Sequence, residues 1–235
     1  LFSGVSGSAP RMFAVTFADS GLTGANAIPS GLFNGVSGAA EEMFGGTFQG
    51  TGITSIPSGL FSGVSGSAKG LFQQTFWDTN ITSIPSGLFS GVSGSAELMF
   101  WGTFYGCTNL TSIPSGLFNG VSGAADWMFS ETFQGCAGLT SIPSGLFSGV
   151  SGAGLGMLSE TFKNCTSLTS LTPGLFSGVS GTADWLFMET FAGDTALSGY
   201  VPRNLFGGAT YNSSNYMMTG IFSGTALATS CDPYN

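Results

Sequence analysis

The sequence TFYGCTNLTSIPSGLF (103–118) returns almost unchanged along the chain. Leu-Phe pairs begin at steps of 28–31 residues, and a second Phe follows each pair 16 or 17 residues later. Repetition at a period of roughly 20–50 residues is typical of stacked repeat proteins. The sequence therefore predicts about eight repeats, whose leading residues are Leu1, Leu32, Leu60, Leu88, Leu117, Leu146, Leu175 and Leu205.

The residues before each second Phe have helical spacing. In the unit that ends at Phe133, apolar or small residues occupy 125, 128, 129 and 133, which would lie on one face of a helix. Acids such as Asp126 stand where the first helical turn would favour them, and Gly135 stands where a helix would end. This pattern predicts a helix of two to three turns in every repeat.

The segment after each predicted helix is short and rich in β-branched residues, as in LTSIP (110–114 and 139–143). We expect one short strand per repeat, stacked in parallel on its neighbours at ~4.8 Å. The predicted fold class is an α/β solenoid, leucine-rich-repeat-like, with about eight coils of short parallel strand plus short helix. One solenoid is expected over 1–227, followed by a C-terminal tail at 228–235.

Composition restricts the classes of function. Twelve acids against four bases give a net charge of −8, which repels phosphate backbones and anionic lipid headgroups, so no nucleic-acid partner is expected. No run approaches the roughly 18 apolar residues of a spanning helix, so no membrane insertion is expected. The chain begins within a repeat, and we interpret it as a mature or trimmed piece of a longer protein.

Three segments carry a resemblance to a known family: FYGCTNLTSIP (104–114), FQGCAGLTSIP (133–143) and FKNCTSLTSL (162–171). They resemble the F-x-G/N-C-x-x-L-x-x-I signature of BspA-like leucine-rich-repeat surface proteins, as a variant with long repeats of 28–29 residues. The resemblance implies an extracellular or cell-surface location and a role in adhesion or assembly.

Two repeated columns contain residues capable of chemistry. Cys107, Cys136 and Cys165 share one repeat position, which predicts a structural column of buried thiols, with one disulfide as the alternative. Zinc is not expected, because the chain has no His and no C-x-x-C. A second column, Glu131, Glu160 and Glu189, is expected to be a solvated outer face, with a calcium-binding stripe as the alternative.

Two sets of residues are candidates for a ligand face. Hydroxyl side chains recur on the predicted strand at Thr54, Thr82, Thr111, Thr140 and Thr169, and would bind glycans, order water or simply keep that face polar. Trp127 and Trp185 share a position on the predicted helix, and exposed aromatic residues often contact sugars or proteins. Contact with neighbouring helices is the alternative for these two side chains.

No enzyme activity and no cofactor are expected. The chain has no His, no G-x-S-x-G elbow and no phosphate-binding G-x-x-x-x-G-K loop, and its acids are isolated or stand in repeat columns.

The expected function is that of an extracellular structural or adhesive repeat protein that assembles with itself, head to tail, into a filament. Repeat proteins need polar terminal caps to stay soluble, whereas both ends of this sequence present repeat residues. The expected assembly ends are Leu1, Phe2, Phe222 and Leu227. The alternative is an adhesin module that binds a surface glycan or a host protein through the threonines or the tryptophans.

Overall fold

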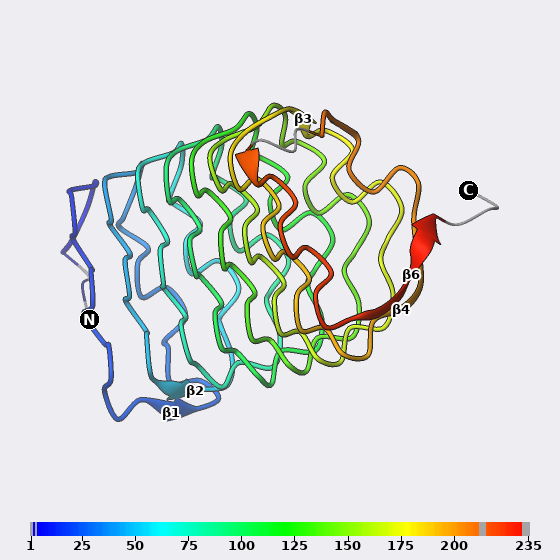
Figure 1. Cartoon of the computed structure of the whole chain (residues 1–235). Helices are drawn as coiled ribbons and strands as arrows, with labels where there is room; N and C mark the ends of the chain where they lie inside the picture. Colours follow the sequence, from blue (N-terminus) through cyan, green and yellow to red (C-terminus); the bar gives the residue numbers. More distant parts are fainter. Residues whose placement is uncertain (1, 3, 212–214, 232–235) are drawn as a thin grey trace.

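The computed structural model describes residues 2, 4–211 and 215–231, which form a stack of rungs, one per sequence repeat (Figure 1). Colours in Figure 1 run from blue at the N-terminal rung to red at the C-terminal rung, so sequence neighbours are also neighbours in the stack. We number the rungs 1 to 8 from the N-terminus. The complete inner rungs are rung 2 (32–59), rung 3 (60–87), rung 4 (88–116), rung 5 (117–145), rung 6 (146–174) and rung 7 (175–204).

The regular strands are few and short, and all of them pair in parallel. β1 (Thr23–Gly24) pairs with β2 (Gly52–Ile53), and β3 (Ser180–Gly181) pairs with β5 (Gly208–Ala209). The longest pair joins β4 (Ser198–Val201) to β6 (Ala226–Cys231) across rungs 7 and 8. β6 therefore crosses the expected boundary between repeats and tail at residue 227.

The described residues contain no α-helix, so the predicted α/β solenoid, a leucine-rich-repeat-like array with a helix in each coil, is wrong. The segment predicted as helix is instead a run of tight turns, which we call the turn segment. In rung 5 it has a positive φ at every fourth residue: 55° at Trp127, 56° at Glu131 and 73° at Gly135. A helix has no such residues, because its φ is negative throughout.

The hydrogen bonds of the turn segment also differ from those of a helix. In rung 5, the N–H groups of Trp127, Phe129, Glu131, Phe133 and Gly135 donate to carbonyls of rung 6, at 2.8–3.0 Å. The N–H groups between them donate three residues back within the rung, as from Thr132 to Phe129 at 3.2 Å. Every N–H of the segment is thus satisfied, half within the rung and half by the next one.

The misinterpretation has a geometric cause. A turn segment that repeats its backbone every four residues directs side chains i and i+4 to the same side, and so does an α-helix. The buried Phe129 and Phe133 therefore fit both structures.

Stacked phenylalanines fill the core. The column of second Phe residues has ring centroids 5.4–5.7 Å apart and nearly parallel planes from rung to rung. On rungs 2 to 7, the Thr before this Phe is buried and its hydroxyl bonds to carbonyls: Thr132 Oγ1 donates to Phe129 O at 2.7 Å and to Phe100 O at 3.0 Å. Each of rungs 2 to 7 is thus tied to the rung before it by apolar stacking and by a side-chain hydrogen bond. Among the described residues, no helix is long and apolar enough to cross a membrane.

Candidate functional site

The first candidate site is the pair of end faces of the stack. The turn segments of rungs 2 to 7 donate N–H groups to the following rung and accept hydrogen bonds on their carbonyls from the preceding one. In rung 1, the carbonyls at the accepting positions have no donor among the described residues. They belong to Pro10, Met12, Ala14, Thr16 and Ala18.

Rung 8 has the opposite arrangement. It accepts hydrogen bonds from rung 7, for example from Phe191 N–H to Ile221 O at 2.9 Å. Its own N–H groups at the donating positions have no acceptor within the described part of the chain. They belong to Tyr216, Met218, Gly220, Phe222 and Gly224. One end of the stack therefore presents a row of acceptors, and the other presents a row of donors with the same spacing.

The expected assembly residues lie at these ends, apart from Leu1, which lies outside the described residues. Phe2 packs its ring against Phe13 at 5.2 Å and against Phe33 at 6.1 Å, so it belongs to the core of rungs 1 and 2. Phe222 stacks on Phe191 at 5.7 Å and is half-buried. Leu227 is half-buried in β6, where Gly199 is its Cα partner.

The threonines of the predicted strand form a ladder on the outside of the stack. The N–H of Thr111 donates to Thr82 O at 3.4 Å, and the N–H of Thr140 donates to Thr111 O at 3.5 Å. Four of these threonines are exposed and Thr54 is half-buried. Of the five segments that carry these threonines, only the one at Ile53 includes a strand, so the expected continuous strand stack reduces across rungs 3 to 6 to a ladder of single backbone bonds.

The tryptophans lie on the turn segments, so the two candidate ligand sets belong to different segments of each rung. Trp127 and Trp185 come from rungs 5 and 7, and their ring centroids are 5.9 Å apart. They meet across rung 6 because Gly156 has no side chain; a Cβ there would overlap the Trp127 ring.

A second aromatic group on the turn segments includes a residue that sequence reasoning missed. Tyr105 stacks on Trp77 with centroids 3.8 Å apart and planes 8° apart, and Trp101 lies 6.2 Å from Trp77. Trp101 donates from Nε1 to Glu131 Oε1 at 3.3 Å. The shared position of Trp77 and Tyr105, directly after the second Phe, was the signal available in the sequence.

The glutamate column is neutralised in part by a lysine. Lys163 Nζ lies 2.8 Å from Glu160 Oε2 and 2.6 Å from Glu189 Oε2. Burial raises the pKa of Glu131 above its ordinary value, while the hydrogen bond from Trp101 lowers it. The described residues include no group of three or more acids and cysteines arranged to hold a metal ion.

The three cysteines of the expected column are buried and free, and no disulfide joins them. Each thiol donates to a carbonyl of the preceding rung: Cys107 to Phe76 O at 3.1 Å, Cys136 to Phe104 O at 3.2 Å, and Cys165 to Phe133 O at 3.3 Å. Burial raises the pKa of Cys107 to about 12, so the reactive thiolate is strongly disfavoured.

The next member of the same column is Asp194, a buried acid that sequence reasoning missed. Its Oδ1 accepts from the N–H of Cys165 at 2.7 Å, and its Oδ2 has no hydrogen-bond partner. Burial raises the pKa of this carboxyl from 3.8 to about 8. The signal in the sequence was an Asp in the place of the column's Cys.

No protein-family model and no curated protein matches the chain.

Proposed function

We propose that the protein is a structural repeat protein that associates end to end, with rung 8 of one copy adding onto rung 1 of the next. The observation that carries this proposal is the match between the two end faces. The donor row of Tyr216, Met218, Gly220, Phe222 and Gly224 has the spacing of the acceptor row on rung 1. Joining them repeats the contact that every pair of neighbouring rungs already makes.

The energetics of such a joint are favourable. Five backbone hydrogen bonds would contribute about 0.5–1.5 kcal/mol each. The half-buried rings of Phe17 and Phe222 would continue the Phe column, in which neighbouring centroids are 5.4–5.7 Å apart. A head-to-tail contact has open symmetry, so repeated addition gives a filament and not a closed dimer.

The described part of the rung-8 end face also lacks the usual protection against edge-to-edge pairing. Natural proteins protect exposed backbone edges with charged side chains, especially Lys. The described residues of rung 8 include no Asp, Glu, Lys or Arg. On rung 1, Arg11 forms an ion pair with Glu42 of rung 2, so its charge is partly neutralised within the molecule. The extracellular location belongs to this proposal and rests on the resemblance to BspA-like surface proteins alone.

The test is electron microscopy and sedimentation velocity of the 235-residue chain across a concentration series. We expect threads of uniform width whose length grows with concentration. Met218→Lys places a charge in the donor row and should abolish growth, whereas Ser148→Lys, on the exposed side of rung 6, should leave it intact. The proposal is refuted if the unsubstituted chain stays monomeric at high concentration, or if threads still form after Met218→Lys.

A second candidate function is favoured by the aromatic groups on the turn segments. Stacked, partly exposed rings such as Trp77 and Tyr105 offer flat apolar surface beside the carboxylate of Asp78, which accepts a hydrogen bond from Trp77 Nε1 at 3.0 Å, a combination suited to sugar rings. A glycan screen tests it. Binding should be lost in Trp77→Ala and in the double variant Trp127→Ala/Trp185→Ala, while Thr111→Ala on the threonine ladder should bind normally. A negative screen, or equal loss in all variants, removes this candidate.

A further inference from the structure

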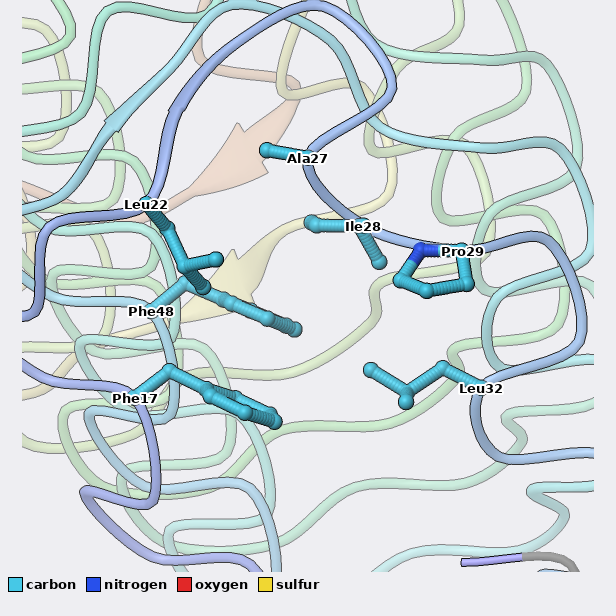
Figure 2. Close-up of a pocket in the computed structure, with 7 residues that line it drawn as sticks. All are labelled: Phe17, Leu22, Ala27, Ile28, Pro29, Leu32 and Phe48. Carbon is cyan, nitrogen blue, oxygen red and sulfur yellow. The ribbon is translucent and has the colours of Figure 1, made fainter. Parts of the chain in front are cut away.

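An apolar pocket of about 240 Å³ lies in rung 1. Figure 2 shows Phe17, Leu22 and Phe48 on one side of it and Ile28, Pro29 and Leu32 on the other, with their side chains directed into a common space. Ala27 completes the lining, so every lining side chain is a hydrocarbon. The pocket therefore suits an uncharged apolar group.

One core column of the inner rungs has no completely buried member on rung 1. On rungs 2 to 7, one Ile or Leu of this column is completely buried in each rung. On rung 1, the Cα partner of Ile53 is Gly24, which contributes no side chain. The column consists of Ile53, Ile81, Leu110, Leu139, Leu168 and Leu197.

The connector of rung 1 is also different. Fifteen residue steps separate Phe17 from Leu32, compared with twelve between Phe48 and Leu60 in rung 2. The longer connector carries Ala27 and Ile28 to the far side of the pocket (Figure 2).

The pocket lies at the solvent-facing end of the core. Phe17 and Leu22 are only half-buried, whereas Phe48 and Ile53 on the next rung are completely buried. A further rung on this face would cover the ring of Phe17 and the side chain of Leu22.

The other end of the stack carries an apolar side chain that no following rung covers. β6 places Leu227 beside Gly199, its Cα partner on rung 7, and the N–H of Ala226 bonds to Leu197 O at 2.9 Å. Leu227 is half-buried and packs against the core from one side only. One end therefore has an unfilled apolar space, and the other has a leucine without a following neighbour.

We infer that the rung-1 pocket is the socket for Leu227 of a second copy, which fixes how the two end faces align. This inference rests on the proposed end-to-end association and adds its alignment. Hydrogen bonds alone leave the joint free to slip, because the turn segment repeats its backbone every four residues. A leucine in a socket on a different segment of the rung permits one alignment only. The space is sufficient, since an apolar cavity of about 150 Å³ already holds a benzene molecule.

The direct test is a cross-link between copies. In a chain carrying Cys231→Ser, we introduce Ala27→Cys and Leu227→Cys, oxidise the protein, and identify linked peptides by mass spectrometry. The two positions lie in rungs 1 and 8, so a link between them reports a joint between copies. We expect the yield of linked multimers to be at least about tenfold higher than with the control pair Ser148→Cys/Leu227→Cys. Joined threads without the 27–227 link would overturn the socket while leaving the proposed association intact.

The second test measures affinity without relying on cysteines. Leu227→Ala should raise the dissociation constant of the joint about tenfold or more, as expected for the loss of a buried anchor. Ala27→Phe fills the socket and should weaken association similarly, with near-ultraviolet circular dichroism confirming that the chain stays folded. Toluene serves as a probe that needs no mutation and should compete with association. If toluene binds in the pocket without weakening association, the pocket is a small-molecule site and the inference is refuted. If the unsubstituted chain stays monomeric, the proposed function itself is refuted.

Discussion

Asp194 accepts a hydrogen bond from the backbone N–H of Cys165 on the preceding rung, with 2.7 Å between Oδ1 and N, while its second oxygen has no partner. Burial raises the pKa of the carboxyl from 3.8 to about 8. The folded state therefore holds this proton more tightly than the unfolded state does. The free energy of unfolding should fall as the pH rises from about 4 to about 8, by up to roughly 1.4 kcal/mol per pH unit from this group.

Urea denaturation at pH 5, 6, 7 and 8 checks this prediction. Asp194→Asn keeps an acceptor for the Cys165 N–H and cannot ionise, so the difference between the two proteins isolates the carboxyl. The variant should gain stability relative to the parent as the pH rises. A difference that is constant over this range would show that the carboxyl is already ionised in the fold.

Thr132 is predicted to stabilise the stack through its hydroxyl. Thr132→Val keeps the shape of the side chain but removes hydrogen bonds to Phe129 O and Phe100 O, leaving two carbonyls of adjacent rungs each with one bond fewer. We expect a loss of about 1–3 kcal/mol in the free energy of unfolding, measured by urea denaturation. Thr132→Ser retains the hydroxyl and loses only a methyl group, so it should cost less stability than Thr132→Val. If Thr132→Ser costs more, the packing of the methyl group, and not the hydroxyl, stabilises the stack.

The sequence predicted the repeat, its length and most of its core positions, because stacked Phe and Leu columns require the same residue type in every rung. It did not predict the backbone of the turn segment. The positions with positive φ carry Trp127, Glu131 and Leu98 as well as glycines, so residue type did not mark them. Bonds to the next rung hold that conformation, and a local pattern does not show such bonds.

The candidate site was predictable to a similar degree. The end positions Phe222 and Leu227 follow from the repeat register, and so does the cysteine column. The donor and acceptor rows do not, because their polarity depends on which N–H groups cross between rungs. The pocket of rung 1 depends on the path of the connector that carries Ala27, Ile28 and Pro29, which the spacing of the repeats alone does not give.

The thiols of the cysteine column are predicted to be unreactive in the folded protein. Cys107, Cys136 and Cys165 are completely buried, burial raises their pKa values, and each donates to a carbonyl. In a Cys231→Ser background, labelling with a thiol reagent should follow the rate of unfolding and accelerate in urea. Rapid labelling in buffer would mean that the stack opens locally at rungs 4 to 6.

Gly156 is predicted to be required for the contact between Trp127 and Trp185. Gly156→Ala places a Cβ on the six-membered ring of Trp127, so the indole must move and the pair must separate. Its φ of 55° adds backbone strain for any residue with a Cβ, at roughly 1–2 kcal/mol.

Gly135→Ala is the matched control, because Gly135 also has a positive φ of 73° while its nearest atoms would lie 3.5 Å from the new Cβ. We expect Gly156→Ala to lose about 1–3 kcal/mol more than the control in urea denaturation, with a change in tryptophan fluorescence that the control lacks. Equal losses and unchanged fluorescence would show that the indole of Trp127 does not lie over Gly156.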